Sequence, residues 1–288
     1  MRKYFNILLA SALSVGATVT VASNSDVNDN DAKALANYFV NKFPGVDTSE
    51  LVNGAYALNP NGYDQFLNIE EFPPYEDFVA IGEEIYNTPF KNGKSFADCF
   101  GDDPSVVKAK YPRWDADKEM VLTLEGEINK CLTDNGEKSL GWKKGKIAYV
   151  SGYWSTLARG QTINVVVPDD PKAIAAYEDG KKHFYQKRGQ LNLSCADCHV
   201  YYAGNYVRSE VLSPATGHTS HFPVYRQKWA NASDKEDGLG TLHRRYGGCN
   251  KQVRAKPFKA QSEEYRNLEY FHTSMSNGLE YNGPAYRK

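Results

Sequence analysis

The chain has 288 residues, and its 34 Lys and Arg residues against 35 Asp and Glu give a net charge of −1. Apolar residues make up 41% and aromatic residues 13%, which excludes intrinsic disorder, and the balanced charge argues against a basic nucleic-acid-binding protein. Five cysteines are too few for a small disulfide scaffold, and their odd number leaves at least one outside any intrachain pairing.

The first 22 residues have the pattern of a signal peptide. Arg2 and Lys3 give a basic start, an apolar run follows over residues 7–21, and Thr20 and Ala22 suit the cleavage site. The alternative is a retained N-terminal anchor, although the run is short and contains several small polar residues. No later segment could span a bilayer, so we expect an exported periplasmic protein without a membrane span in the mature chain.

The elements predicted after this segment are helical or irregular. Residues 23–31 are polar and are expected to be loose, and the apolar spacing that follows predicts a helix over residues 31–42. Many Asn, Gly and Pro residues predict an irregular surface loop over residues 46–75. Residues 144–159 have a helical pattern, residues 163–167 predict a short extended linker, and no stretch suggests a sizeable sheet.

Two stretches of the chain resemble each other. Residues 82–100 and 180–199 each contain a helical segment with a glycine and an aromatic residue, a glycine-containing connector, and then a shared Ala-Asp-Cys sequence. Each stretch is followed by a predicted closing helix, over residues 118–134 and 262–276, which ends at an Asn-Gly stop signal. The shared Ala-Asp-Cys sequence favours a duplication over a chance match of two helical patterns.

The second stretch contains the attachment signature of c-type haem. Its sequence Cys195-Ala196-Asp197-Cys198-His199 is C-x-x-C-H, in which two thiols add to the vinyl groups of one porphyrin and the histidine binds the iron. The alternatives are a redox dithiol, which normally follows a strand of a thioredoxin-like unit, and half of a zinc site, which needs a second Cys/His pair. Neither context is visible, so the sequence predicts one covalent haem c.

The corresponding positions of the first stretch cannot hold a haem. Phe96 replaces the first cysteine and Phe100 replaces the histidine, which leaves Cys99 alone. In an oxidising compartment Cys131, 32 residues later, is the expected disulfide partner of Cys99, and closing this loop would contribute about 3–4 kcal/mol. The alternative is a pair of free buried cysteines.

These patterns predict a mainly α fold made of two cytochrome c-like domains in tandem, of which the N-terminal one lacks haem. After the signal peptide of residues 1–22, residues 23–162 would form the haem-less domain with the disulfide. Residues 163–288 would form the haem c domain with the remaining cysteine.

The remaining cysteine is Cys249, which lies in the segment His243-Arg244-Arg245-Tyr246-Gly247-Gly248-Cys249. Two glycines permit close approach of the backbone to a flat group, and two arginines favour the thiolate form of a nearby cysteine. This part of the chain normally supplies the second axial ligand of a haem c, and Met275 is poorly placed at the end of a predicted helix. We therefore predict Cys249 as the distal ligand, with a buried inert thiol as the alternative. Three histidines also remain alternatives as ligands: His218, His221 and His243.

At this point the chain resembles the SoxA family, the catalytic subunits of the SoxAX cytochromes of thiosulfate-oxidising systems. The matching stretches are Arg188 to Ser194, Phe222-Pro223-Val224-Tyr225-Arg226, Trp229, the Arg245-x3-Cys249 loop, Val253 to Pro257, Leu268-Glu269, and Tyr111-Pro112-Arg113 in the first unit. The resemblance covers most of the mature chain. It is closest to the one-haem type, in which a disulfide replaces the first haem site.

The resemblance implies an L-cysteine S-thiosulfotransferase, which joins thiosulfate oxidatively to a cysteine of the carrier SoxYZ while electrons pass through haem c to the cytochrome SoxX. It implies that Cys195 and Cys198 hold the haem, that His199 and Cys249 bind the iron, that Cys249 is also the catalytic sulfur, and that Arg245 holds the sulfonate. The rival interpretation is a plain periplasmic electron-transfer cytochrome c. A third is a subunit that only anchors SoxX.

Overall fold

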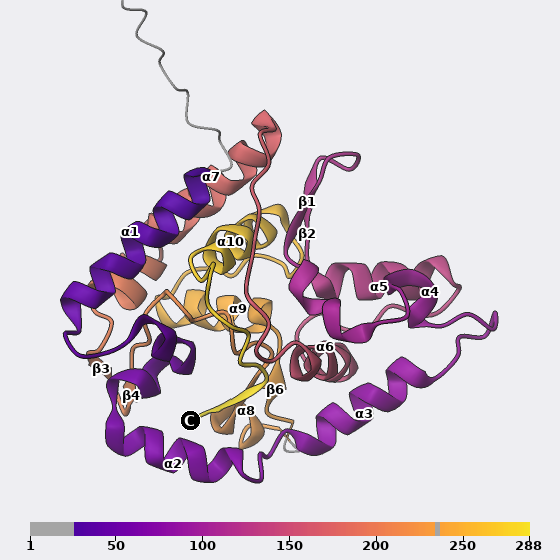
Figure 1. The fold of residues 1–288 in the computed structure, drawn as a ribbon, viewed down its shortest axis with the longest axis horizontal. Helices are drawn as coiled ribbons and strands as arrows, with labels where there is room; N and C mark the ends of the chain where they lie inside the picture. Colours follow the sequence, from indigo (N-terminus) through magenta and orange to yellow (C-terminus); the bar gives the residue numbers. More distant parts are fainter. Residues whose placement is uncertain (1–25, 234–236) are drawn as a thin grey trace, which may run out of the picture.

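The computed structural model describes residues 26–233 and 237–288, and these residues form a mainly helical fold (Figure 1). The predicted signal peptide of residues 1–22 lies outside the described residues. Within the described ranges, no helix combines the length and the apolar character needed to cross a membrane.

Two pairs of packed helices organise the fold. The pairs are α3 (Glu76–Asn87) with α6 (Lys146–Leu157), and α7 (Pro171–Tyr185) with α10 (Glu263–Ser274). In each pair, a glycine of one helix lies directly against the backbone of the other. A Cβ atom at Gly82 would lie 2.1 Å from the carbonyl oxygen of Tyr149, and one at Gly180 would lie 2.0 Å from that of Asn267. The first half of the described chain, residues 26–162, and the second half, from residue 163 onward, thus use the same kind of helix packing.

The first half differs from the prediction in its closing helix. The sequence predicted one helix over residues 118–134, but this stretch contains the strand β2 (Met120–Leu122) and the helix α5 (Leu124–Asp134). The side chain of Thr123 accepts a hydrogen bond from the Gly126 amide and begins α5, which separates the helix from the strand. The helix that packs on α3 is α6, so α6 is the counterpart of α10.

The other elements of the first half are short. They are α4 (Phe96–Phe100), η2 (Pro104–Val106), η3 (Lys108–Lys110) and β1 (Arg113–Asp115), which pairs with β2 in an antiparallel hairpin. Cys99 of α4 and Cys131 of α5 form the disulfide that the sequence predicted, with an S–S distance of 2.01 Å. Beside it, the rings of Phe96 and Phe100 lie 5.7 and 4.8 Å from the ring of Trp154.

Two predictions for the N-terminal region are wrong. From residue 26 onward the segment expected to be loose is helical, because α1 spans Asp26–Lys42. The expected loop over residues 46–75 contains η1 (Thr48–Leu58) and α2 (Pro60–Glu70). Asn59 caps α2 by accepting a hydrogen bond from the Gly62 amide, and Pro60 occupies the first turn, so these loop-forming residue types begin a helix here.

The second half surrounds the haem motif. Its short elements are η4 (Asp197–Tyr201), β3 (Tyr206–Val207), β4 (Glu210–Val211), β5 (Val224–Arg226), α8 (Gln227–Ala230), β6 (Leu239–Gly240), α9 (Leu242–Gln252) and β7 (Ala285–Arg287). In the largest sheet of the described residues, β5 pairs antiparallel with β6 and parallel with β7. The predicted closing helix is confirmed as α10, and α1 packs against it through the same hydrophobic core.

Candidate functional site

A cavity of about 730 Å³ in the second half contains the haem motif. The residues that line it include all five predicted site residues of this half, namely Cys195, Cys198, His199, Arg245 and Cys249.

A reciprocal cap shapes the turn that carries the motif. The amide and hydroxyl of Ser194 both donate to the carboxylate of Asp197, and the Asp197 amide donates to the Ser194 hydroxyl at 2.9 Å. This arrangement satisfies free amides at the start of a helical turn. In the first half, Ser95 and Asp98 form the same kind of cap at the start of α4.

The imidazole of His199 is prepared to bind a metal. Its Nδ1 lies 2.9 Å from the carbonyl oxygen of Ser213, and because a carbonyl only accepts, Nδ1 must donate its proton. The lone pair of Nε2 is then free for a metal, and a hydrogen bond of this kind fixes ligand histidines in metal sites. Burial also lowers the pKa of His199 to about 4, so the ring is neutral as a ligand must be.

The two motif cysteines lie in surroundings that favour uncharged sulfur. Burial, and next the nearby Cys249 sulfur, raise the pKa of the Cys195 thiol to about 12. The same two causes raise the pKa of Cys198. A thioether is also uncharged, so this environment suits sulfur atoms that are bonded to a porphyrin.

Arg245 and Cys249 lie on one helix, although the sequence placed them on a loop. The side chain of Thr241 caps α9 by accepting from the Arg244 amide, and Gly247 and Gly248 lie inside the helix. Four residues correspond to roughly 40° more than one helical turn, so Arg245 and Cys249 share a face. Both side chains line the cavity and are half-buried.

The three histidines considered as alternative ligands lie in different places. The Gln261 amide donates to Nδ1 of His243 at 3.0 Å, and Nε2 of the same ring lies 3.0 Å from Glu269, so His243 has no free ring nitrogen. His218 lines the cavity, but its ring centre is only 4.3 Å from that of His199, so the rings lie beside each other rather than across an iron atom. His221 is buried and does not line the cavity.

Two further lining residues carry polar groups that sequence reasoning did not select. Arg188 donates to Nε2 of His183 at 2.7 Å and also contributes to the cavity wall. His272 of α10 contacts the Tyr246 hydroxyl through Nδ1 at 3.1 Å, while its buried Nε2 has no hydrogen-bond partner in the described residues. Arg188 lies in a stretch that matched the family, whereas no local pattern marks His272 within its helix.

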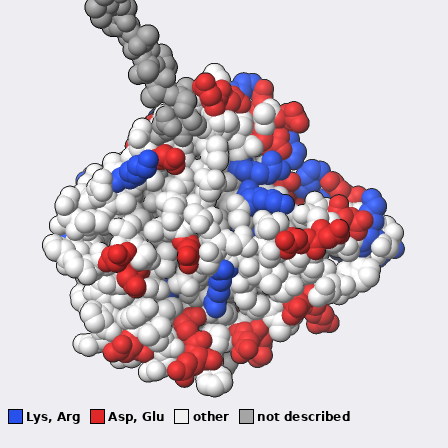
Figure 2. Space-filling view, viewed as in Figure 1, with Lys and Arg blue, Asp and Glu red and all other residues white. Residues whose placement is uncertain are grey.

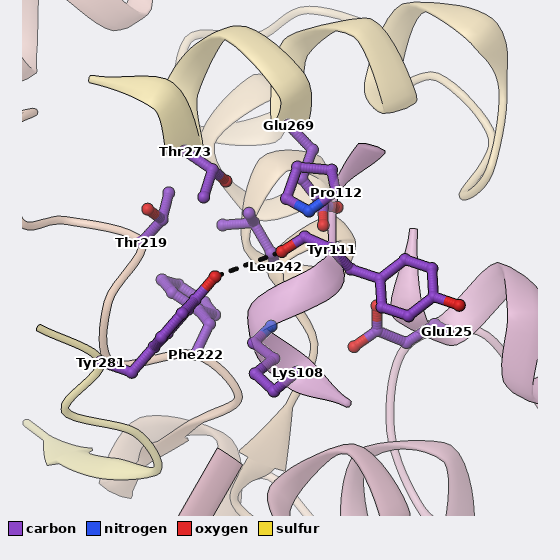
Figure 3. A pocket seen from close by; sticks show the side chains of 10 residues that line it. All are labelled: Lys108, Tyr111, Pro112, Glu125, Thr219, Phe222, Leu242, Glu269, Thr273 and Tyr281. Atoms are coloured by element: carbon purple, nitrogen blue, oxygen red, sulfur yellow. Dashed lines mark hydrogen bonds between the residues drawn. The ribbon is translucent and has the colours of Figure 1, made fainter. Parts of the chain in front are cut away.

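A smaller cavity of about 320 Å³ lies between the two halves and contains none of the predicted site residues (Figure 3). Tyr281 closes one side of it by donating a hydrogen bond of 3.2 Å to the carbonyl oxygen of Tyr111. Buried charged groups of both halves meet there, with Lys108 and Glu125 from the first and Glu269 from the second.

Comparison with known proteins identifies the family. The family model of the SoxA/TsdA cytochrome c domain matches residues 81–163. The chain is 48% identical to the L-cysteine S-thiosulfotransferase subunit SoxA of Allochromatium vinosum, with 98% of both chains covered, and 50% identical to that of Chlorobaculum tepidum, with 92% of both covered. It also resembles a chain in the crystal structure of SoxXA from P. pantotrophus, with a TM-score of 0.69 and 31% identity over 78% of this chain and 84% of that one. With its helical fold and its cavity around a C-x-x-C-H motif, the chain belongs to the SoxA family.

Proposed function

We propose that the protein is the haem c-bearing subunit of an L-cysteine S-thiosulfotransferase, which joins thiosulfate oxidatively to a cysteine of a carrier protein. Cys195 and Cys198 hold the haem through thioether bonds, and His199 and Cys249 bind its iron. One observation carries the proposal: Cys249 and Arg245, one helical turn apart on α9, line the same cavity as the C-x-x-C-H motif. The names of the relatives at 48% and 50% identity support the activity.

Arg245 is suited to bind the substrate. Thiosulfate carries two negative charges, and a guanidinium binds sulfonate oxygens through two parallel hydrogen bonds. Because Arg245 lies about one turn before Cys249 on α9, its guanidinium can hold the sulfonate while the outer sulfur faces the cysteine.

The chemistry on the protein side is a sulfur exchange. A bond forms between the outer sulfur of thiosulfate and the Cys249 sulfur, and two electrons are released. Haem c, when bound, supplies the acceptor through which these electrons leave one at a time. The thiolate of the carrier cysteine then attacks the outer sulfur and displaces Cys249 as a thiolate, so the carrier leaves with a thiosulfonate group.

The spectrum of the oxidised holoprotein tests the ligand assignment. We expect a low-spin optical and paramagnetic signature of histidine and thiolate ligands, and Cys249→Ala should abolish that signature while the haem stays attached. A plain electron-transfer cytochrome would instead have two histidine ligands, or histidine with another neutral ligand. An unchanged spectrum in the Cys249→Ala protein would therefore rule the assignment out.

We also infer that residues 23–162 include a cytochrome c-like domain without haem and that residues 163–288 form the domain with the single haem. The matching glycine contacts of Gly82 and Gly180 support a relationship between the two domains. The family-model match over residues 81–163 supports the cytochrome c-like character of the first. In the first domain, the rings of Phe96 and Phe100 pack against Trp154 at the positions that correspond to the haem motif. The disulfide between Cys99 and Cys131 lies in the same region.

The same proposal covers partners and location. The resemblance to a chain of a SoxXA structure supports a cytochrome SoxX as electron acceptor, and SoxYZ as carrier fits the transferase activity. On the face shown in Figure 2, acidic and basic side chains are interspersed rather than gathered into one basic stripe, which does not suit nucleic acid. The intact mass of periplasmic protein should show loss of residues 1–22, one haem and one disulfide, and a second haem would contradict the one-haem assignment.

A further inference from the structure

His243 is buried and joins three parts of the second half. Since the Gln261 amide donates to its Nδ1 at 3.0 Å, the ring proton resides on Nε2. Nε2 then donates to the carboxylate of Glu269 on α10, at 3.0 Å, with the Tyr265 carbonyl oxygen 3.2 Å away. His243 and Glu269 are only 2% and 5% exposed, so this contact is shielded from water.

Two more polar contacts join α9 to α10. Nδ2 of Asn250 donates to the Tyr265 hydroxyl at 2.7 Å, and the Tyr246 hydroxyl lies 3.1 Å from Nδ1 of His272. The α9 members of the three contacts are at positions 243, 246 and 250, which is the spacing of one helix face. The α10 members, at 265, 269 and 272, also form one face.

This polar face lies next to the face that carries the chemistry. His243 and Cys249 are six residues apart, which places them roughly 120° apart around the axis of α9. A rotation of α9 that broke the contacts to α10 would therefore also turn Cys249 and Arg245 away from their present direction. Buried polar pairs resist such a rotation, because any other setting leaves donors and acceptors without partners.

We infer that the polar contacts between α9 and α10 set the rotation of α9 that directs Cys249 and Arg245 into the cavity, with His243 and Glu269 as the principal positioning residues. This inference rests on the proposed role of Cys249 as ligand and catalytic sulfur. In this inference His243 positions α9, whereas in the alternative interpretation it would bind the iron itself. Glu269 also lines the cavity between the two halves of the molecule (Figure 3). The contact between His243 and Glu269 therefore connects α9 to the boundary between the halves.

The test changes both partners of the contact together, so that no buried carboxylate is left without its donor. In a His243→Asn/Glu269→Leu double variant, Asn can still accept from the Gln261 amide, because its side chain reaches as far as Nδ1 of histidine, and no carboxylate remains. Glu269→Gln is the conservative variant, since its amide oxygen still accepts from Nε2. The matched control is Lys251→Met, at an exposed position of α9.

We expect the double variant to retain covalent haem but to show a second ligand species in the paramagnetic spectrum and thiosulfate conjugation about 10- to 100-fold slower, because small displacements of catalytic groups have effects of this size. Glu269→Gln and Lys251→Met should keep one species and the parent rate. A single parent-like species and rate in the double variant would overturn the inference.

A second variant keeps the inference testable if the double variant does not fold. Tyr246→Phe/Tyr265→Phe removes both hydroxyls of the other contacts and leaves every ring in place, and we expect it to yield the second species at a lower fraction. A parent-like spectrum here would count against the inference. The spectrum of the parent protein separates the proposed function from the positioning role. If the parent has no histidine/thiolate signal, the proposed function fails. If the parent has this signal and both variants retain it unchanged, only the positioning role is refuted.

Discussion

Some residues of the site can be identified from the sequence alone, whereas others are revealed only by the structure. The C-x-x-C-H motif names Cys195, Cys198 and His199, because haem attachment requires two thiols and an imidazole at that spacing. The structure adds the hydrogen bond to Ser213 that leaves Nε2 of His199 free, and no sequence pattern specifies this carbonyl. His272 is likewise invisible in sequence, since it reaches the cavity only through the packing of α10.

Arg245 provides the first test at this scale. Arg245→Ala should lower kcat/KM for thiosulfate by about 100-fold, since a charge-assisted bidentate contact contributes roughly 2–3 kcal/mol. Arg245→Lys should recover only part of this loss, because an ammonium cannot form the two parallel hydrogen bonds. Steady-state kinetics with varied thiosulfate measure both effects, with Lys256→Ala as an exposed control. Kinetics of Arg245→Ala equal to those of the parent would remove this residue from the site.

At the scale of elements, the glycines at the two helix crossings determine how closely the paired helices pack. Gly82 and Gly180 have no room for a side chain, because the added carbon would lie about 2 Å from a backbone carbonyl oxygen of the facing helix. A backbone contact cannot be relieved by moving one flexible side chain, so the helices themselves would have to separate.

Gly180→Ala should therefore lower the free energy of unfolding by several kcal/mol, as overpacking of a core crossing does, and loosen α7 from α10. Gly141→Ala is the matched control, since a Cβ there would meet nothing within 4 Å. Urea unfolding of both variants measures the difference. Equal stabilities would mean that the two helices are not held at the observed distance.

The errors in the predicted elements have a common physical cause. Asn59, Pro60 and the pair Gly247-Gly248 were treated as loop residues, yet Asn59 and Pro60 begin α2 and the two glycines lie within α9. Asn and Pro at a helix start satisfy or remove free amides, so the same residue types serve loops and caps. The helix over residues 262–276 was predictable because its apolar spacing and its Asn-Gly stop agree.

At the scale of the whole molecule, the second half buries many histidines in neutral form. His183 shows the effect away from the proposed iron ligands: burial, and next the positive charge of Arg188, lower its pKa to about 4. Burial also lowers the pKa of His272, to about 3, and takes the pKa of His218 and His221 well below its usual range. The fold should therefore lose stability in mild acid.

The sign follows from proton binding. The pKa of His183 is about 4 in the folded state and 6.5 in the unfolded chain, so between these values the unfolded chain binds more protons. Its contribution, about 3 kcal/mol, is complete above pH 6.5 and is lost as the pH falls through 4. His183→Gln should reduce the slope of unfolding free energy against pH in this window, as urea titrations can measure. An unchanged slope would contradict the neutral buried state of His183.

The most direct measurement of the central claim is thiosulfate conjugation by the Cys249→Ala holoprotein in complex with its cytochrome partner. Cys195 and Cys198 are intact in this variant, so we expect full covalent haem content, while transfer of thiosulfate to the carrier cysteine falls to the rate without enzyme. Turnover within about tenfold of the parent, with haem attached, would contradict the assignment of Cys249 as the catalytic sulfur.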